Sequence, residues 1–219
     1  MIKNIIFDFD GVLVDSEILV SKAFCKYLGN LNISVSEKDI AFYAGNKTID
    51  VIDKLSLRFN IEDKQKLFND IMLIANNIYN KELKSVKGTE KFLSAINQEK
   101  FIASNSGKER IIKGLKNVNL YNFFEEKNIY SYDLVKNPKP EPDIYLKIIK
   151  DNKINPEEAL IIEDSAIGTT AGVAADMRVI GLTAGGHWYE GRNKKILKDA
   201  GAFAVVNNYV DLLYIIRKL

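Results

Sequence analysis

The feature that most constrains the fold is an alternation of short apolar runs with segments of helical periodicity, which extends from residue 88 to residue 206. Short apolar runs bounded by turn residues predict buried strands, and an apolar period of three to four residues predicts an amphipathic helix between them. Strands that alternate with helices favour a parallel sheet covered by helices on both faces. We therefore predict an α/β fold with a Rossmann-like, doubly wound parallel sheet.

An apolar run near the start of the chain adds one more strand to this sheet. The predicted strands are residues 5–7, 101–104, 128–131, 160–163, 179–182 and 202–206. The helices predicted between them are residues 89–97, 110–116, 142–150 and 166–175.

A long block with helical periodicity separates the first predicted strand from the rest of the sheet. Its two ends must return close together if one sheet is to form, so the block is expected to be an insertion. We predict an α/β core made of residues 1–15 and 85–219, with residues 16–84 inserted as an all-α helical cap. Ser16 is expected to cap the first helix of the insertion. The cap is expected to lie over the edge of the sheet and to control the access of water there.

The composition excludes several classes of function. There are 31 Lys and Arg against 29 Asp and Glu, a net charge of +2, which argues against nucleic acid or an anionic membrane as a partner. Cys25 is the only cysteine, so an internal disulfide and a cysteine-clustered zinc site are excluded. No apolar stretch is long enough for a signal peptide or a membrane span. A cytoplasmic monomer is therefore expected.

Polar side chains follow several of the predicted strands. They are Asp8 and Asp10 after the first strand, Ser104, Asn105 and Ser106 after the second, Glu163, Asp164 and Ser165 after the fourth, and Lys139 in a proline-rich loop after the third. The carboxyl ends of parallel strands share one edge of a sheet, which is where such sheets bind ligands. Converging carboxylates repel one another unless a hard cation accepts them as ligands, and Mg²⁺ leaves room in its shell for phosphate oxygens. The pattern predicts a Mg²⁺ site that receives an anionic substrate.

Four motifs in this order resemble those of the haloacid dehalogenase-like hydrolases that carry a helical cap. They are Asp8 to Ser16, Ala103-Ser104-Asn105, Lys139-Pro140-Glu141-Pro142-Asp143, and Ile162-Glu163-Asp164-Ser165 with Gly168. Within that family, the chain looks most like sugar-phosphate phosphatases of the 6-phosphogluconate phosphatase type and like β-phosphoglucomutases.

The resemblance implies a role for each of these residues. Asp8 would attack phosphorus and form an aspartyl-phosphate, and Asp10 would act as general acid and base. Mg²⁺ would be held by Asp8, by the backbone carbonyl of Asp10 and by Asp164, with Glu163 as an additional or outer ligand. The residues that would bind phosphate are Ser104, Asn105 and Lys139. The expected function is a Mg²⁺-dependent phosphatase of small phosphorylated metabolites, with sugar phosphates as the expected class.

Alternatives remain at this point. A β-phosphoglucomutase-type phosphotransferase would use the same residues, but the cap shows no arginine next to Gly45, which favours hydrolysis. A phospho-accepting signalling domain fits poorly because it would lack a cap. Lys47 in the cap is a candidate for substrate binding and equally an ordinary solvated lysine. His187 has no evident partner in the sequence and is expected to pack in a loop.

Overall fold

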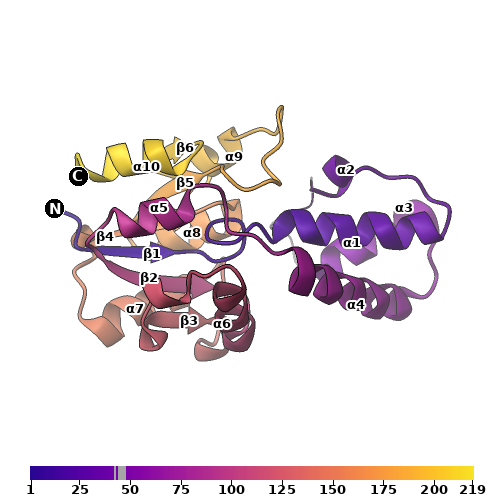
Figure 1. Ribbon diagram of the computed structural model, residues 1–219, viewed down its shortest axis with the longest axis horizontal. Coiled ribbons are helices and arrows are strands. Elements are labelled where there is room, and N and C mark those ends of the chain that lie inside the picture. Colours follow the sequence, from indigo (N-terminus) through magenta and orange to yellow (C-terminus); the bar gives the residue numbers. More distant parts are fainter. Residues whose placement is uncertain (42, 44–47) are drawn as a thin grey trace.

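The computed structural model describes residues 1–41, 43 and 48–219. Within these residues, six parallel strands form one sheet in the order β3-β2-β1-β4-β5-β6 (Figure 1). The strands are β1 Asn4–Phe7, β2 Glu99–Ser104, β3 Ile129–Ser131, β4 Ala159–Glu163, β5 Arg178–Leu182 and β6 Ala204–Val206. The prediction of a doubly wound parallel sheet is confirmed.

Helices cover both faces of the sheet because its central strands are apolar on both sides. In β1, Ile5 and Phe7 pack into the cluster that contains Leu212 of α10, whereas Ile6 packs into the cluster that contains Ile148 of α7. Helices α5 Thr89–Ser94, α6 Lys108–Asn117 and α10 Tyr209–Ile216 contribute to the first cluster. Helices α7 Asp143–Asn152 and α8 Ala166–Ala174 contribute to the second, and α9 Lys195–Asp199 adjoins α8.

The chain changes direction across the sheet at β1. It passes from β1 through β2 to β3, and then returns to the other side of β1 for β4, β5 and β6. The last residue of β1, Phe7, lies opposite Ile102 and Ile162, so the carboxyl ends of the three central strands lie at similar heights. Such a switch point opens a crevice for ligands at the carboxyl edge of the sheet.

The described part of segment 16–84 contains four helices, which lie beyond the carboxyl edge of the sheet (Figure 1). Its helices are α1 Glu17–Asn30, α2 Glu37–Ala41, α3 Thr48–Phe59 and α4 Lys64–Glu82. They share a hydrophobic cluster separate from those of the sheet. The two connections to the sheet run side by side, since the Asp15 amide donates to the Lys84 carbonyl over 2.9 Å.

Ser16 does not cap α1 through its hydroxyl, contrary to the sequence prediction. It occupies the position before the helix, but its backbone is already helical, with φ −87° and ψ −28°, whereas a capping residue is typically extended. Its hydroxyl instead donates to Asp10 Oδ1 over 2.5 Å. The first residue of the helical segment is thereby tied to the end of the first strand.

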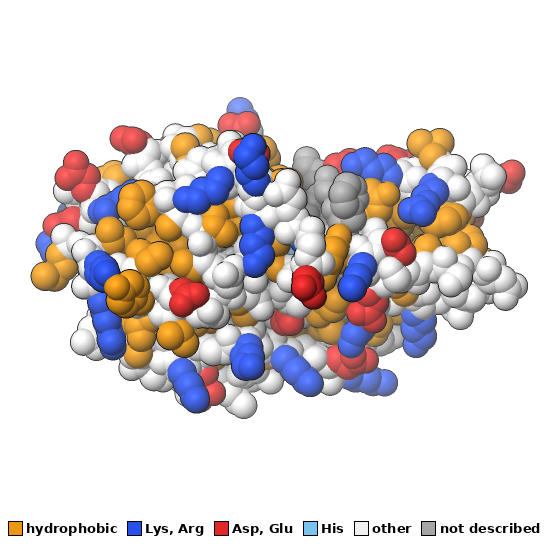
Figure 2. All heavy atoms as spheres, turned by 90° about the horizontal axis from the view of Figure 1, so that it is seen from above, with side chains coloured by type: hydrophobic (Ala, Val, Ile, Leu, Met, Phe, Trp, Pro, Cys, Tyr) orange, Lys and Arg blue, Asp and Glu red, His pale blue; other side chains and the backbone are white. Residues whose placement is uncertain are grey.

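The surface carries both signs of charge. Acidic and basic side chains lie interspersed over the face of the described residues that Figure 2 shows. Among the residues with described positions, none of the helices is both long and apolar enough to span a lipid bilayer.

Candidate active site

The structure brings the predicted polar residues together at the carboxyl edge of the sheet. Asp8 follows β1, Ser104 ends β2, Glu163 ends β4, and Lys139 reaches them from the loop between β3 and α7. All four side chains are buried. Charged groups removed from water in this way must be compensated by one another.

Lys139 lies at the centre of this group and is only 3% exposed. Its Nζ donates to Asp8 Oδ1 over 2.7 Å, to Glu163 Oε1 over 2.6 Å and to the Ala103 carbonyl over 2.8 Å. Burial on its own lowers the pKa of Lys139, but the Asp8 and Glu163 carboxylates outweigh it and hold that pKa well above its usual range. Lys139 therefore presents a permanent positive charge beside Asp8.

Asn105 holds the backbone of the lysine loop. Its side-chain Nδ2 donates to the Lys139 carbonyl and its Oδ1 accepts the Lys139 amide, each over 3.0 Å. Both ends of the side-chain amide are therefore occupied by backbone groups. The phosphate-binding role expected of Asn105 would then fall to its backbone rather than to its side chain.

Glu163 also has its oxygens engaged by neighbouring donors. Oε1 accepts Lys139 Nζ, and Oε2 accepts the Asp164 amide over 3.0 Å and both the amide and the hydroxyl of Ser165. The carboxylate lies against Gly168 so closely that a Cβ there would overlap Glu163 Oε1, which explains the glycine in the fourth motif. Both Glu163 oxygens are therefore occupied by protein donors, which would place Glu163 in an outer rather than a direct position if a metal were bound here.

Asp10 faces the opposite way, toward the helical segment. One oxygen accepts the Ser16 hydroxyl over 2.5 Å, and the other accepts the Ser106 hydroxyl over 2.6 Å. The guanidinium of Arg110 in α6 approaches Oδ1 at 3.5 Å. Ser106 was expected at this edge from the sequence, whereas Arg110 was not.

Asp8 and Asp164 are two buried carboxylates whose negative charges are only partly balanced by nearby positive charge. Burial raises the pKa of Asp8 well above its usual range, Lys139 lowers it, and Glu163 and Asp164 raise it further. Burial likewise raises the pKa of Asp164, and Glu163 adds to the effect. Gly11 has φ 85°, and a Cβ at this position would overlap Asp164 Oδ2, so the glycine admits Asp164 to the turn after β1.

His187 is buried in its loop and also contacts Asp164, a partner that the sequence alone did not reveal. Its Nε2 lies 3.0 Å from Asp164 Oδ2, and the side chain is 2% exposed. Burial lowers the pKa of His187 to about 4, so the ring beside the carboxylate is neutral. The sequence could not supply this partner, because a loop after β5 brings the histidine back over Gly11.

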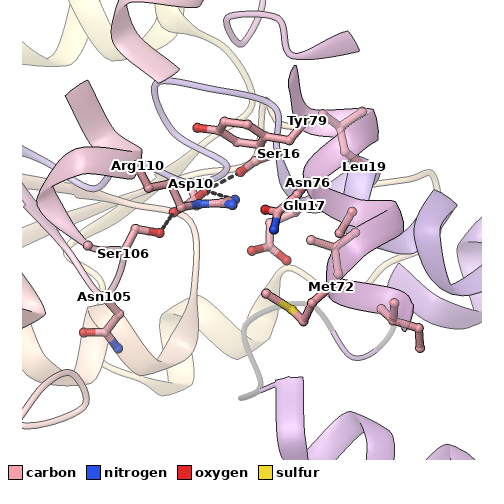
Figure 3. A pocket seen from close by; sticks show the side chains of 14 residues that line it. Asp10, Ser16, Glu17, Leu19, Met72, Asn76, Tyr79, Asn105, Ser106 and Arg110 are labelled. Atoms are coloured by element: carbon pink, nitrogen blue, oxygen red, sulfur yellow. Dashed lines mark hydrogen bonds and ion pairs between the residues drawn. The ribbon is translucent and has the colours of Figure 1, made fainter. Parts of the chain in front are cut away.

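A cavity of about 360 Å³ opens beside Asp10, between the sheet edge and helices α1 and α4 (Figure 3). Its polar lining includes Asp10, Glu17 and Asn76, and Arg110 reaches it from α6. Burial raises the pKa of the Glu17 carboxyl to about 7. The candidate substrate residue Lys47 lies outside the described residues, together with Gly45 and Asn46.

The amino-acid sequence is similar to those of haloacid dehalogenase-like hydrolases, including phosphatases. The family model for haloacid dehalogenase-like hydrolases matches residues 5–182. The chain is 26% identical over 188 residues to 6-phosphogluconate phosphatase of Escherichia coli, covering 85% of each protein. It is 25% identical over 218 residues to a phosphorylated carbohydrates phosphatase of Thermotoga maritima, covering 93% of this chain and 94% of that protein.

Solved structures of similar proteins superimpose on nearly the whole chain. A haloacid dehalogenase-like protein of unknown function from Agrobacterium tumefaciens superimposes with a TM-score of 0.91 at 30% identity, covering 100% of this chain and 99% of that one. A family hydrolase from Deinococcus radiodurans, solved with bound phosphate and sodium, has a TM-score of 0.86 at 25% identity, covering 99% and 96%.

Proposed function

The chain belongs to the haloacid dehalogenase-like hydrolase family, and from this premise we propose that it hydrolyses phosphate monoesters of small metabolites, with sugar phosphates as the substrate class. The observation that carries the proposal is the buried contact of Lys139 with Asp8, beside an Asp10 that faces the cavity. Asp8 could act as a nucleophile beside the fixed positive charge of Lys139, and Asp10 could act as an acid facing a substrate pocket. This arrangement suits phosphoryl transfer.

The proposed reaction has two steps. An oxygen of Asp8 bonds to phosphorus while the ester P–O bond breaks, and Asp10 donates its proton to the departing alkoxide. Water then attacks the phosphorus of the aspartyl-phosphate, Asp10 accepts a proton from that water, and inorganic phosphate leaves Asp8. Ser104 and the Lys139 ammonium offset the negative charge that otherwise keeps a carboxylate away from a phosphate.

We propose Mg²⁺ as the cofactor, held by the Asp8 and Asp164 carboxylates and by the Asp10 backbone carbonyl. Among the described residues, no three acidic, histidine or cysteine side chains form a metal site by themselves. Mg²⁺ suits such a site, because it commonly uses one or two carboxylates and completes its shell with water and substrate phosphate. The raised pKa values of Asp8 and Asp164 likewise mark a place where a cation would relieve repulsion. When bound, the ion supplies positive charge to the phosphoryl oxygens.

We also propose that residues 16–84 act as a cap over a core of residues 1–15 and 85–219. The cavity beside Asp10 is lined from both parts, by α1 and α4 on one side and by the loop after β2 on the other. A segment placed in this way can exclude water from the phosphoryl group and select the leaving group.

The proposal is tested by phosphate release from a panel of sugar phosphates, nucleotides and phosphoglycolate, with Mg²⁺ and with a chelator. We expect Mg²⁺-dependent release, strongest with sugar phosphates. Incubation with β-glucose 1-phosphate tests the mutase alternative in the same assay. Net conversion to glucose 6-phosphate without phosphate release would refute hydrolysis as the function.

Asp10→Asn should lower kcat by about 10³-fold, since general acid–base catalysis contributes rate factors of this order. The amide oxygen can still accept one serine hydroxyl, and the amide nitrogen can donate to the other, but the group cannot transfer the proton. Because loss of the base also slows the attack of water, labelled phosphate should accumulate on the protein, as measured by acid quench after mixing with a ³²P-labelled substrate. A variant that turns over at the wild-type rate would exclude Asp10 as the acid and base.

His187→Gln should weaken activation by Mg²⁺ by about 10-fold, as is typical when a group that orients a metal-binding carboxylate is lost. The Mg²⁺ concentration at half-maximal activity and the rise in Tm on addition of Mg²⁺ both report this effect. Tyr189→Phe in the same loop is the matched control and should leave both values unchanged. An unchanged Mg²⁺ response in His187→Gln would show that the contact with Asp164 does not orient a metal ligand.

A further inference from the structure

Arg110 is a feature of the cavity that the proposed reaction does not use. It lies in the first turn of α6, and its guanidinium reaches the region between Asp10 and Asn76 (Figure 3). Of the described residues that line the cavity, Arg110 is the one with a basic side chain. The phosphoryl group of a substrate already has Lys139 and Ser104, which lie deeper at the sheet edge.

The guanidinium is held in place by packing across the two parts of the molecule. Its Cζ lies 4.1 Å from the ring centroid of Tyr79 in α4. Tyr79 in turn lies directly against Gly114, one helical turn after Arg110, where a Cβ would overlap the tyrosine hydroxyl. Stacking on an aromatic face restricts a guanidinium to one plane, so the orientation of its N–H groups is set before a ligand arrives.

Asp10 uses only part of the hydrogen-bonding capacity of the Arg110 guanidinium. The separation of 3.5 Å is long for an arginine–carboxylate pair, which normally closes to about 2.7–2.9 Å. Both oxygens of Asp10 instead accept short hydrogen bonds from Ser16 and Ser106. The Arg110 side chain is 34% exposed, and hydrogen bonding to described residues uses one of its five N–H groups.

We infer that Arg110 binds a carboxylate of the substrate and thereby selects phosphate monoesters of sugar acids over those of neutral polyols and sugars. This inference rests on the proposed phosphatase function and specifies its substrate class. The proton donor Asp10 marks where the leaving oxygen must lie, and Arg110 lies beside Asp10 on the side of the cavity. A carbon chain that extends from this oxygen into the cavity therefore passes the guanidinium.

A carboxylate fits this position better than a second phosphate. Its two oxygens match the planar fork of one guanidinium and carry a single charge. A second phosphate would bring about two negative charges against one arginine, close to Asp10 and Glu17. A cavity of about 360 Å³ is also small, which suits a short hydroxylated chain with Asn76 as a hydrogen-bonding partner.

The test compares two substrates with the same six-carbon chain, 6-phosphogluconate and glucitol 6-phosphate, which differ in a carboxylate and a hydroxymethyl group. Wild-type protein should show a higher kcat/KM for 6-phosphogluconate. Arg110→Gln should lower this value by roughly 10- to 100-fold, the effect typical of losing a hydrogen bond to a charged group, mainly through KM. Its kcat/KM for glucitol 6-phosphate should change less than about threefold. Arg110→Lys, which keeps the charge without the fork, should fall between wild type and Arg110→Gln.

Lys113→Gln is the matched control, because Lys113 is an exposed cation on the same helix. It should leave both substrates unaffected. The Tm of each variant shows whether loss of the stacking on Tyr79 has unfolded the protein, and Arg110→Lys keeps a cation beside the Tyr79 ring if Arg110→Gln does not fold.

Three results would overturn the inference. Equal losses for both substrates in Arg110→Gln, together with weaker inhibition by inorganic phosphate, would assign Arg110 to the phosphoryl group or to Asp10. A wild-type protein that hydrolyses both substrates equally well would remove the proposed selectivity while leaving the phosphatase function intact. The absence of phosphate release from every ester in the panel would instead refute the phosphatase function, and this inference with it.

Discussion

Asp8→Asn should lower phosphatase turnover by about 10⁵-fold or more while the fold is retained, since loss of a catalytic nucleophile has effects of this order. Asparagine has nearly the same shape as aspartate and can still accept a hydrogen bond from Lys139, but its amide oxygen is a poor nucleophile. We expect no covalent phosphate on the variant. Phosphate release and acid-quenched labelling measure the loss, and circular dichroism verifies the fold.

Asp176→Asn provides the matched control for Asp8→Asn. Asp176 is exposed and adopts a left-handed backbone with φ 60°, a conformation that asparagine also accepts. This variant should keep wild-type turnover. Steady-state activity in Asp8→Asn near that of the control would exclude Asp8 as the nucleophile and would require a different reaction path.

Lys139→Met should have the largest effect on stability, with a loss of about 3–5 kcal/mol in the free energy of unfolding. Methionine fills the space of the lysine stem but leaves the Asp8 and Glu163 carboxylates buried without their partner. Chemical denaturation measures the loss. Activity should fall by at least about 10²-fold as well, since the charge beside the phosphoryl group is gone.

The stability deficit of Lys139→Met should also depend on pH. Without the ammonium, the pKa of Asp8 rises further above its value in the unfolded chain, so the folded state binds more protons as the pH falls. The deficit should therefore be smaller at pH 5 than at pH 8. Lys136→Met, an exposed lysine of the same loop, should show no deficit. A pH-independent deficit in Lys139→Met would indicate lost packing rather than unpaired carboxylates.

The sequence was sufficient for the sheet and for most elements around it, because buried parallel strands such as 159–163 are apolar throughout. The boundaries were less accurate: the predicted helix 89–97 ends at Ser94, and α9 and α10 were not predicted. Helix α10 has apolar residues on most of its circumference, so its periodicity is weak. Its helical state depends on packing against the sheet.

In the candidate site, too, the sequence predicted which residues lie together but not which side chains contact each other. Parallel strands end at a common edge of the sheet, and this one rule predicts the proximity of Asp8, Ser104, Lys139 and Glu163. The particular partner of each side chain does not follow from it. Asn105 holds the lysine backbone rather than presenting its side chain to an anion, and His187 contacts Asp164 although 23 positions separate them in the sequence.

The sequence by itself determined the parallel α/β fold, the helical insertion and the set of residues at the sheet edge, because burial and periodicity are local properties that a chain carries in its order of residues. Only the tertiary structure decided that Glu163 holds Lys139, that Ser16 and Ser106 hold Asp10, and that Arg110 packs on Tyr79 beside the cavity. The physical reason is that hydrogen bonds depend on distances of a few tenths of an ångström and on orientation. Such distances are set only when different segments of the chain have packed against each other, and Asp10 and Ser106, for example, are 96 positions apart in the sequence.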